Sequence, residues 1–159
     1  MFCDYVKTEN IIVNLESADK DCLFAEMTEV LVRSTPGLDR DEVISSLVSR
    51  EEQMNTCVMK GVAVTHAECS SVSAPVIAIG ISSSGVDYDI DGVSSKDFNE
   101  SLIHVVFMML FEKGNAEKHL RILADCARVL NIPGFYKALL GAKSALDVFN
   151  LIREYETSY

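Results

Sequence analysis

Residues 102–111 read LIHVVFMMLF, a nearly continuous apolar run. Residues 75–82, which read PVIAIGIS, have the same character. A β-strand has this composition when helices cover both faces of its sheet, because neither side of the strand then meets water. Neither run approaches the roughly 18 apolar residues that a membrane-spanning helix needs. We therefore expect two central strands of a buried sheet and no membrane insertion.

Two more segments have strand character. Apolar side chains alternate along residues 10–16 (NIIVNLE), and residues 61–65 (GVAVT) form a short apolar run that we expect to end at His66. Residues 82–99 are polar and contain the dipeptides Ser84-Gly85 and Asp91-Gly92, which are typical of turns. This segment predicts a short hairpin or a functional loop between the two central strands.

Helical patterns occupy much of the remaining chain. Apolar spacing predicts a helix over residues 19–33, and a capping-box pattern at Asp39 and Glu42 predicts the start of a second. Asn115, Pro133 and Ser144 begin three later helical segments. The predicted inward faces of the four longer helices are Leu23, Met27, Val30 and Leu31; Ile44, Leu47 and Val48; Leu120, Leu123, Ala127 and Leu130; and Val148, Leu151, Ile152 and Tyr155. Strands interleaved with helices predict an α/β sandwich, with a mixed central sheet flanked by helices, in a single domain over residues 1–159.

Composition narrows the classes of partner. The 159 residues carry a formal net charge of −10, which argues against nucleic-acid binding because phosphate backbones are bound by basic surfaces. The five cysteines include no CxxC pair, and no basic and apolar leader begins the chain. We expect a cytoplasmic protein with free thiols.

The three histidines are the first candidates for chemistry, because an imidazole has an ordinary pKa of about 6.5. His66 lies sixteen positions after Arg50, whose planar guanidinium suits phosphate oxygens. This pair suggests a histidine that carries a phosphoryl group. A surface histidine with no functional role fits the spacing as well. His119, in the first turn of a predicted helix, is either structural or a second member of that site. His104 lies inside an apolar run and is best interpreted as a core or cross-strand histidine.

Other chemistries have weaker support. Cys57, His66 and Cys69 could bind a metal, but the short paired spacings of structural zinc sites are absent, and nothing singles out either cysteine as a nucleophile. No glycine-rich nucleotide-binding motif occurs. The acidic pair 51–52 predicts a solvated helix end. The alternating aspartates of residues 87–91 lack the glutamate that closes a calcium loop.

Residues 50–66, REEQMNTCVMKGVAVTH, resemble the signature of the fructose/mannitol-type enzyme IIA domain of the bacterial phosphotransferase system. This family includes the nitrogen-regulatory IIA proteins. Its pattern is an arginine followed by acidic residues, a small or hydroxylic pair, and then G-[IV]-A-[IV]-P-H with the same separation. Residues 74–82, 85–92, 103–110, 115–130 and 137–152 resemble later segments of the family. Two departures are Thr65, where the family usually has proline, and a longer stretch after Asp91-Gly92.

The resemblance implies a phosphotransferase component that forms a phosphohistidine at His66, with Arg50 as the supporting arginine and His119 as the second active-site histidine. The implied donor is an HPr-type phosphocarrier protein, and the recipient is a IIB domain or a regulatory target protein. Neither a metal nor a nucleotide cofactor is implied. A single domain of this type favours nitrogen-type regulation, and sugar uptake remains open. The alternative, motivated by Thr65 and the longer loop after Asp91, is a binding-only regulatory protein with a IIA fold and little phosphotransfer.

Overall fold

The computed structural model describes residues 1–88 and 102–159. The expected turn at Asp91-Gly92 and most of the alternating aspartates lie outside the described residues. Within them the chain forms a five-stranded sheet in the order β1-β4-β5-β3-β2. The strands are β1 (Val6–Ile12), β2 (Cys57–Met59), β3 (Val62–Glu68), β4 (Val76–Asp87) and β5 (Leu102–Phe111). The sheet is mixed, as predicted, because β1–β4 and β3–β5 pair in parallel, whereas β4–β5 and β2–β3 pair antiparallel.

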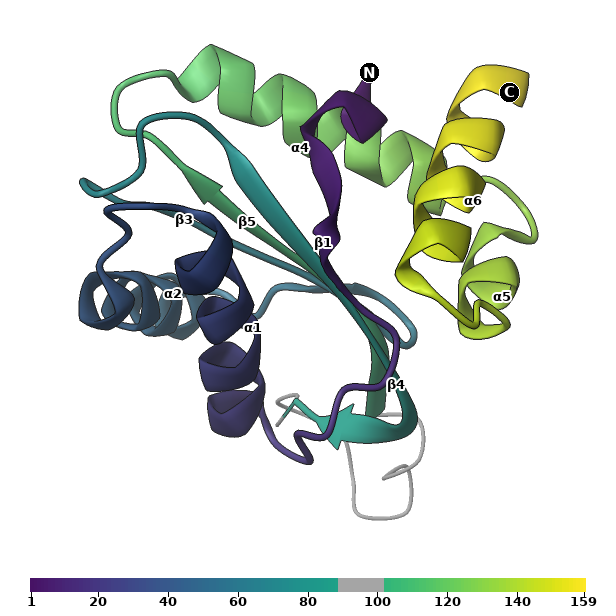
Figure 1. The fold of residues 1–159 in the computed structure, drawn as a ribbon, viewed down its shortest axis with the longest axis horizontal. Helices are drawn as coiled ribbons and strands as arrows, with labels where there is room; N and C mark the ends of the chain where they lie inside the picture. The colour runs from purple at the N-terminus through teal and green to yellow at the C-terminus, as the bar shows by residue number, and fades with distance from the viewer. Residues whose placement is uncertain (89–101) are drawn as a thin grey trace.

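Helices cover both faces of this sheet (Figure 1). On one face lie α1 (Lys20–Ser34) and α2 (Arg40–Gln53), and on the other lie α4 (Ala116–Leu130), α5 (Phe135–Leu140) and α6 (Ala145–Ser158). A short 3-10 helix, η1 (Phe2–Tyr5), precedes β1 and packs against α6. The predicted α/β sandwich is confirmed.

Strand β5 divides the two halves of the core. Val105, Phe107 and Met109 contact the α4–α6 side, and the residues between them contact the α1–α2 side. All of these side chains are buried, as expected for a central strand covered on both faces. The prediction for residues 102–111 is therefore confirmed, including both of its ends.

Helix starts are also close to the predicted positions. The carboxylates of Asp19 and Asp39, and the hydroxyl of Ser144, each accept a backbone N–H in the first turn of the helix that follows. Asn115 occupies the N-cap position of α4, but its side-chain amide donates to Oε1 of Glu112 instead of capping the helix.

Several strand boundaries differ from the predictions. The first strand covers Val6–Ile12 rather than residues 10–16, because its pairing with β4 begins at Val6 opposite Ile77. Strand β3 continues to Glu68, so His66 lies within it rather than at its end. Strand β4 extends to Asp87 and takes up the first part of the predicted hairpin. The three-residue strand β2 was not predicted, because it is too short to show alternation.

The predicted helix faces need correction as well. In α4 the buried side chains are His119, Ile122, Cys126, Val129 and Leu130, whereas Leu120 is 66% exposed and Ala127 is exposed. Apolar residues occur on two adjacent faces of this helix, and only contact with the sheet decides which of them is buried. In α2, Val43 and Leu47 are buried while Ile44 and Val48 are half-buried. In α6, Val148 and Ile152 are buried, and Leu151 and Tyr155 are half-buried.

Candidate active site

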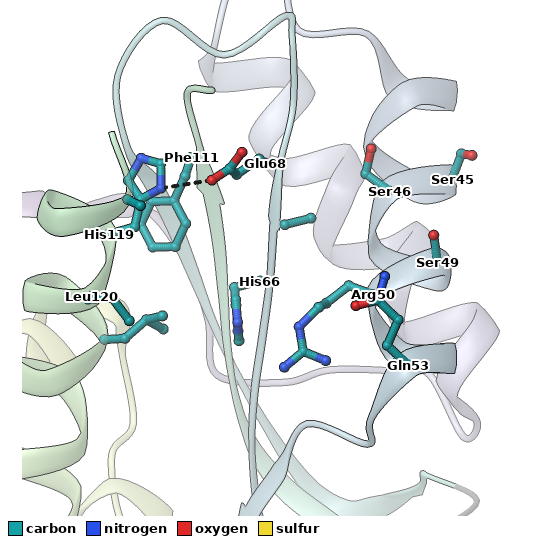
Figure 2. A pocket seen from close by; sticks show the side chains of 13 residues that line it. Ser45, Ser46, Ser49, Arg50, Gln53, His66, Glu68, Phe111, His119 and Leu120 are labelled. Carbon is teal, nitrogen blue, oxygen red and sulfur yellow. Dashed lines mark ion pairs between the residues drawn. The ribbon is translucent and has the colours of Figure 1, made fainter. Parts of the chain in front are cut away.

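A pocket of about 620 Å³ lies where the sheet has an open edge. Strand β2 pairs with β3 only near Val62 and Ala63, so in the described residues the second half of β3 has a neighbouring strand on one side alone. Side chains of α2 and α4, from opposite faces of the sheet, line the two sides of this pocket (Figure 2). His66 on β3, Arg50 on α2 and His119 on α4 all line the pocket. The three predicted site residues are thus brought together.

His66 is half-buried, and its ring is oriented by its own strand. Its Nδ1 lies 3.2 Å from the carbonyl oxygen of Val64, two residues earlier on the same side of β3. A carbonyl oxygen can only accept a hydrogen bond, so Nδ1 carries the proton in this contact. The neutral ring therefore has its lone pair on Nε2.

The surroundings of His66 favour that neutral form. Burial lowers the pKa of His66 below its ordinary value of 6.5, and the Arg50 guanidinium lowers it further. The Val64 carbonyl and the Glu51 carboxylate act in the opposite direction, but the net shift is downward. At neutral pH the Nε2 lone pair is consequently available as a nucleophile.

The ring of His66 also borders a second pocket, whose surface is more apolar. A smaller pocket of about 330 Å³ also includes His66, and its other lining side chains are mostly apolar, among them Val58, Leu123 and Leu130. A group transferred to His66 would therefore meet apolar surface on this side and the guanidinium of Arg50 on the other.

Arg50 lies in the last turn of α2, and in Figure 2 its guanidinium points toward the ring of His66. One of its nitrogens, Nη1, donates to the carbonyl oxygen of Met54 at 2.9 Å. A guanidinium has five N–H groups in a planar fork, so this anchor leaves further donors directed into the pocket. These donors suit the oxygens of a phosphoryl group.

His119 shares the pocket, and its ring faces the Glu68 carboxylate (Figure 2). Nδ1 lies 3.4 Å from Oε1 of Glu68, and Nε2 lies 3.6 Å from Oε2 of Glu112. The ring stacks on Phe111, with centroids 4.3 Å apart and planes 13° from parallel. Because β3 and β5 are parallel, Glu68 and Phe111 come together at the same end of the sheet, where α4 begins.

Glu68 and Glu112 were not singled out from the sequence. Glu112 follows β5 directly, and Lys118 lies 3.7 Å from its Oε1. Although burial opposes ionisation, contacts with its own backbone N–H, Lys118 and His119 lower the pKa of Glu112, so it remains a carboxylate. Only the parallel pairing of β3 with β5, which sequence does not show, places both acids at His119.

The remaining sequence candidates lie elsewhere. His104 is a cross-strand residue, as interpreted, with Nδ1 2.8 Å from the carbonyl oxygen of Ser82 on β4. Cys69 packs in the α1–α2 half of the core, whereas His66 projects between β3 and α4. No group of three metal-ligating side chains occurs among the described residues. Glu51 is buried rather than solvated, which corrects the interpretation of the acidic pair.

The part of the chain that the structure describes contains no helix that is both long and apolar enough to cross a bilayer. The same residues form a mixed α/β sandwich, and His66 and Arg50 line one pocket at its open sheet edge. Residues 4–155 match the family model of the phosphoenolpyruvate-dependent sugar phosphotransferase system, EIIA 2. The chain belongs to this family, as the sequence resemblance implied.

One curated relative is the fructose-specific EIIABC component of the phosphotransferase system from Bacillus subtilis, which is 32% identical over 147 residues. The match covers 92% of this chain but only 22% of that longer protein. The shared part is therefore one portion of a multicomponent protein, and the activity of the whole relative does not transfer directly to this chain.

Solved structures agree on the fold. The nitrogen regulatory protein IIA-Ntr from Neisseria meningitidis superposes with a TM-score of 0.82 at 21% identity, over 94% of this chain and 97% of that one. The enzyme IIA of the mannitol system from Escherichia coli, solved in complex with phosphorylated IIB, gives a TM-score of 0.75 at 16% identity, over 94% and 97%. At these identities the likeness shows the shared architecture alone.

Proposed function

We propose that this chain is a IIA phosphocarrier that accepts a phosphoryl group on Nε2 of His66. The observation that carries this proposal is the orientation of His66, whose Nδ1 proton faces the Val64 carbonyl while Arg50 lines the same pocket. In the step, the N–P bond of a phosphohistidine donor breaks and a P–Nε2 bond forms. The donor ring keeps the electron pair, and the proton on Nδ1 of His66 stays in place.

Arg50 and His119 have supporting roles in this proposal. Phosphoryl transfer proceeds through a loose transition state whose negative charge is spread over three equatorial oxygens. The free N–H groups of Arg50 can bind two of these oxygens at once. His119 is the second active-site histidine of this proposal, and in the present arrangement its ring stacks on Phe111 with Nδ1 3.4 Å from Glu68.

The proposed donor is an HPr-type phosphocarrier protein, and the proposed recipient is a IIB domain or a regulatory target. The mannitol IIA neighbour forms a complex with phosphorylated IIB, which supports the first recipient. The fold shared with IIA-Ntr supports the second. We place this function in the cytoplasm and assign it to residues 1–159 as a single domain.

The test is incubation with phosphoenolpyruvate, enzyme I and HPr, followed by intact-mass spectrometry. Wild-type protein should gain about 80 Da, the mass that one phosphoryl group adds. His66→Ala should gain nothing. His104→Ala is the matched control, because His104 also lies in a strand and also donates from Nδ1 to a carbonyl. A mass gain in His66→Ala equal to that of wild type would overturn the assignment.

A binding-only regulator is the second candidate, favoured by the arrangement of His119. Its two ring nitrogens face Glu68 and Glu112 rather than His66. Under this hypothesis a partner docks on the pocket whatever the state of His66. Pull-down of the partner by His66→Ala and His66→Asp at wild-type level supports it, and strong dependence on either substitution argues against it.

A further inference from the structure

Glu51 is a buried carboxylate that the proposed transfer does not use. It follows Arg50 in the last turn of α2, and it binds the loop that leads into β2. Its Oε1 accepts the backbone N–H of Thr56 at 3.0 Å, and its Oε2 accepts the Thr56 hydroxyl at 2.6 Å. The ammonium of Lys20 lies 3.4 Å from Oε1. These three contacts hold Glu51 and the loop at Thr56 in place. Losing any one of them would leave a buried charge or N–H group without a partner, which costs free energy.

Tyr88, just after β4, completes this cluster. Its side chain is fully buried, and its hydroxyl lies 2.7 Å from Oγ1 of Thr56 and 3.3 Å from Oε2 of Glu51. The single hydroxyl proton of Thr56 is directed to Glu51, so the Tyr88 hydroxyl donates. Burial raises the pKa of Tyr88, which keeps that proton in place. The Lys20 ammonium lies 4.5 Å from the centre of the ring.

The loop that contains Thr56 contacts both Arg50 and the strand that carries His66. The guanidinium of Arg50 is anchored on the carbonyl of Met54, two residues before Thr56. The carbonyl of Thr56 accepts the N–H of Val64 at 3.0 Å, and the carbonyl of Val64 in turn holds Nδ1 of His66. One short loop therefore carries the anchor of the arginine on one side and the anchor of the histidine on the other.

We propose that Glu51, Thr56 and Tyr88 are positioning residues, which fix the Arg50 guanidinium relative to Nε2 of His66. This inference rests on the proposed phosphotransfer and deepens it. None of the three side chains touches the transferred group. They act by holding the loop at residues 54–56, whose movement would shift both the Met54 carbonyl that binds Arg50 and the Thr56 carbonyl that binds β3.

The positions of these groups predict a particular kinetic defect. If the loop shifts, the phosphoryl oxygens lose their alignment in the transition state, while the outer surface that meets the donor protein is unchanged. Misplacement of a catalytic group by about 1 Å can lower a rate about a hundredfold. The maximal rate should therefore fall, whereas KM for the donor protein should change little.

The experiment compares Tyr88→Phe with Tyr155→Phe in transfer from phosphorylated HPr. Tyr155 is a half-buried tyrosine of α6, on the other side of the sheet, and it serves as the matched control. Tyr88→Phe should lower the maximal rate about tenfold or more without changing KM for HPr. Tyr155→Phe should match wild type. Wild-type kinetics in folded Tyr88→Phe would overturn the inference, whereas absence of transfer in wild type would overturn the proposed function instead.

A second pair of variants covers the case in which Tyr88→Phe does not fold. Thr56→Ser keeps the hydroxyl that contacts Glu51 and Tyr88, and Thr56→Val removes it. We expect near wild-type transfer from Thr56→Ser and a loss of about tenfold or more from Thr56→Val. Equal rates for these two variants would overturn the inference. The NMR signals of the Arg50 side chain should broaden or shift in Thr56→Val only.

Discussion

The Nδ1 atom of His66 lies 3.2 Å from the carbonyl oxygen of Val64, its neighbour two residues earlier on the same strand. The contact is local, because both residues belong to β3. It places the ring proton on Nδ1 and leaves Nε2 as the reactive nitrogen. The strand itself thus selects the tautomer that the proposed phosphoryl transfer requires.

This orientation predicts the site of phosphorylation within the ring. We expect the phosphorylated protein to contain Nε2-phosphohistidine, because Nδ1 faces the backbone. Phosphorus NMR combined with ¹⁵N labelling of histidine should show phosphorus coupled to Nε2 of His66. Coupling to Nδ1 would contradict the tautomer that we derive from the Val64 contact.

A second prediction concerns pH. Because burial lowers the pKa of His66 below 6.5, the rate of phosphoryl transfer should stay flat above about pH 7 and fall only below 6.5. NMR titration of the ring gives the pKa directly. In Arg50→Gln the pKa of His66 should be higher than in wild type, since a nearby positive charge is removed. A pKa above 6.5 in the wild-type protein would contradict the buried, neutral ring.

The same shift affects stability with a definite sign. The unfolded chain takes up a proton on His66 at a higher pH than the folded chain does. The contribution of the neutral ring to the free energy of unfolding is therefore fully present above about pH 6.5 and is lost as the pH falls through the lowered pKa. Urea unfolding of wild type and His66→Gln at several pH values should show this difference.

The fold was predictable from sequence wherever the pattern was long. The nearly continuous apolar run of β5 and the helix starts at Asp39 and Ser144 have local causes, and the structure confirms them. The faces of α4 had no such local cause. Leu120 and His119 are adjacent, and only docking on the sheet decides that the histidine is buried and the leucine exposed.

The sequence placed three candidate residues in what proves to be one pocket, but it did not predict how they are arranged there. Arg50, His66 and His119 line one pocket, as the resemblance implied. The carboxylates at His119 and the buried role of Glu51 were not predicted, because they depend on strand pairing and loop contacts between distant residues. An acidic residue in a helical pattern is usually solvated, so sequence gave no reason to bury Glu51.

His119 should contribute to stability as well as to transfer. Its removal in His119→Asn would abolish stacking on Phe111 and take away the ring nitrogens that lie 3.4 Å from Glu68 and 3.6 Å from Glu112. We expect a loss of about 1–3 kcal/mol in the free energy of unfolding. Glu68→Gln, in which the side chain is already 48% exposed, should lose less. Urea unfolding measures both, and a smaller loss for His119→Asn than for Glu68→Gln would contradict the arrangement.

Glu156 should stabilise the N-terminal segment independently of the site. Its carboxylate is fully buried, accepts the backbone N–H groups of Phe2 and Cys3, and lies 3.8 Å from Arg128. In Glu156→Gln one acceptor oxygen becomes an amide donor, so we expect a loss of about 1.5–3 kcal/mol in unfolding free energy. Hydrogen exchange at Phe2 and Cys3 should accelerate. Glu154→Gln, an exposed neighbour, is the control and should change neither quantity.

Arg50→Lys tests the geometry of the guanidinium. One N–H of Arg50 is committed to the Met54 carbonyl, and the remaining donors of the fork are available to phosphoryl oxygens. A single ammonium cannot hold the loop and bind two oxygens in one plane, so transfer should fall about tenfold or more, which corresponds to about 1.4 kcal/mol in the barrier. Stability should change by less than about 0.5 kcal/mol, since Arg50 is only half-buried.

Arg40→Lys is the matched control: Arg40 begins the same helix and binds Glu29 through two nitrogens, remote from His66. Equal transfer rates for Arg50→Lys and Arg40→Lys would remove Arg50 from the transition state, because charge alone would then suffice where we infer that a planar fork is required.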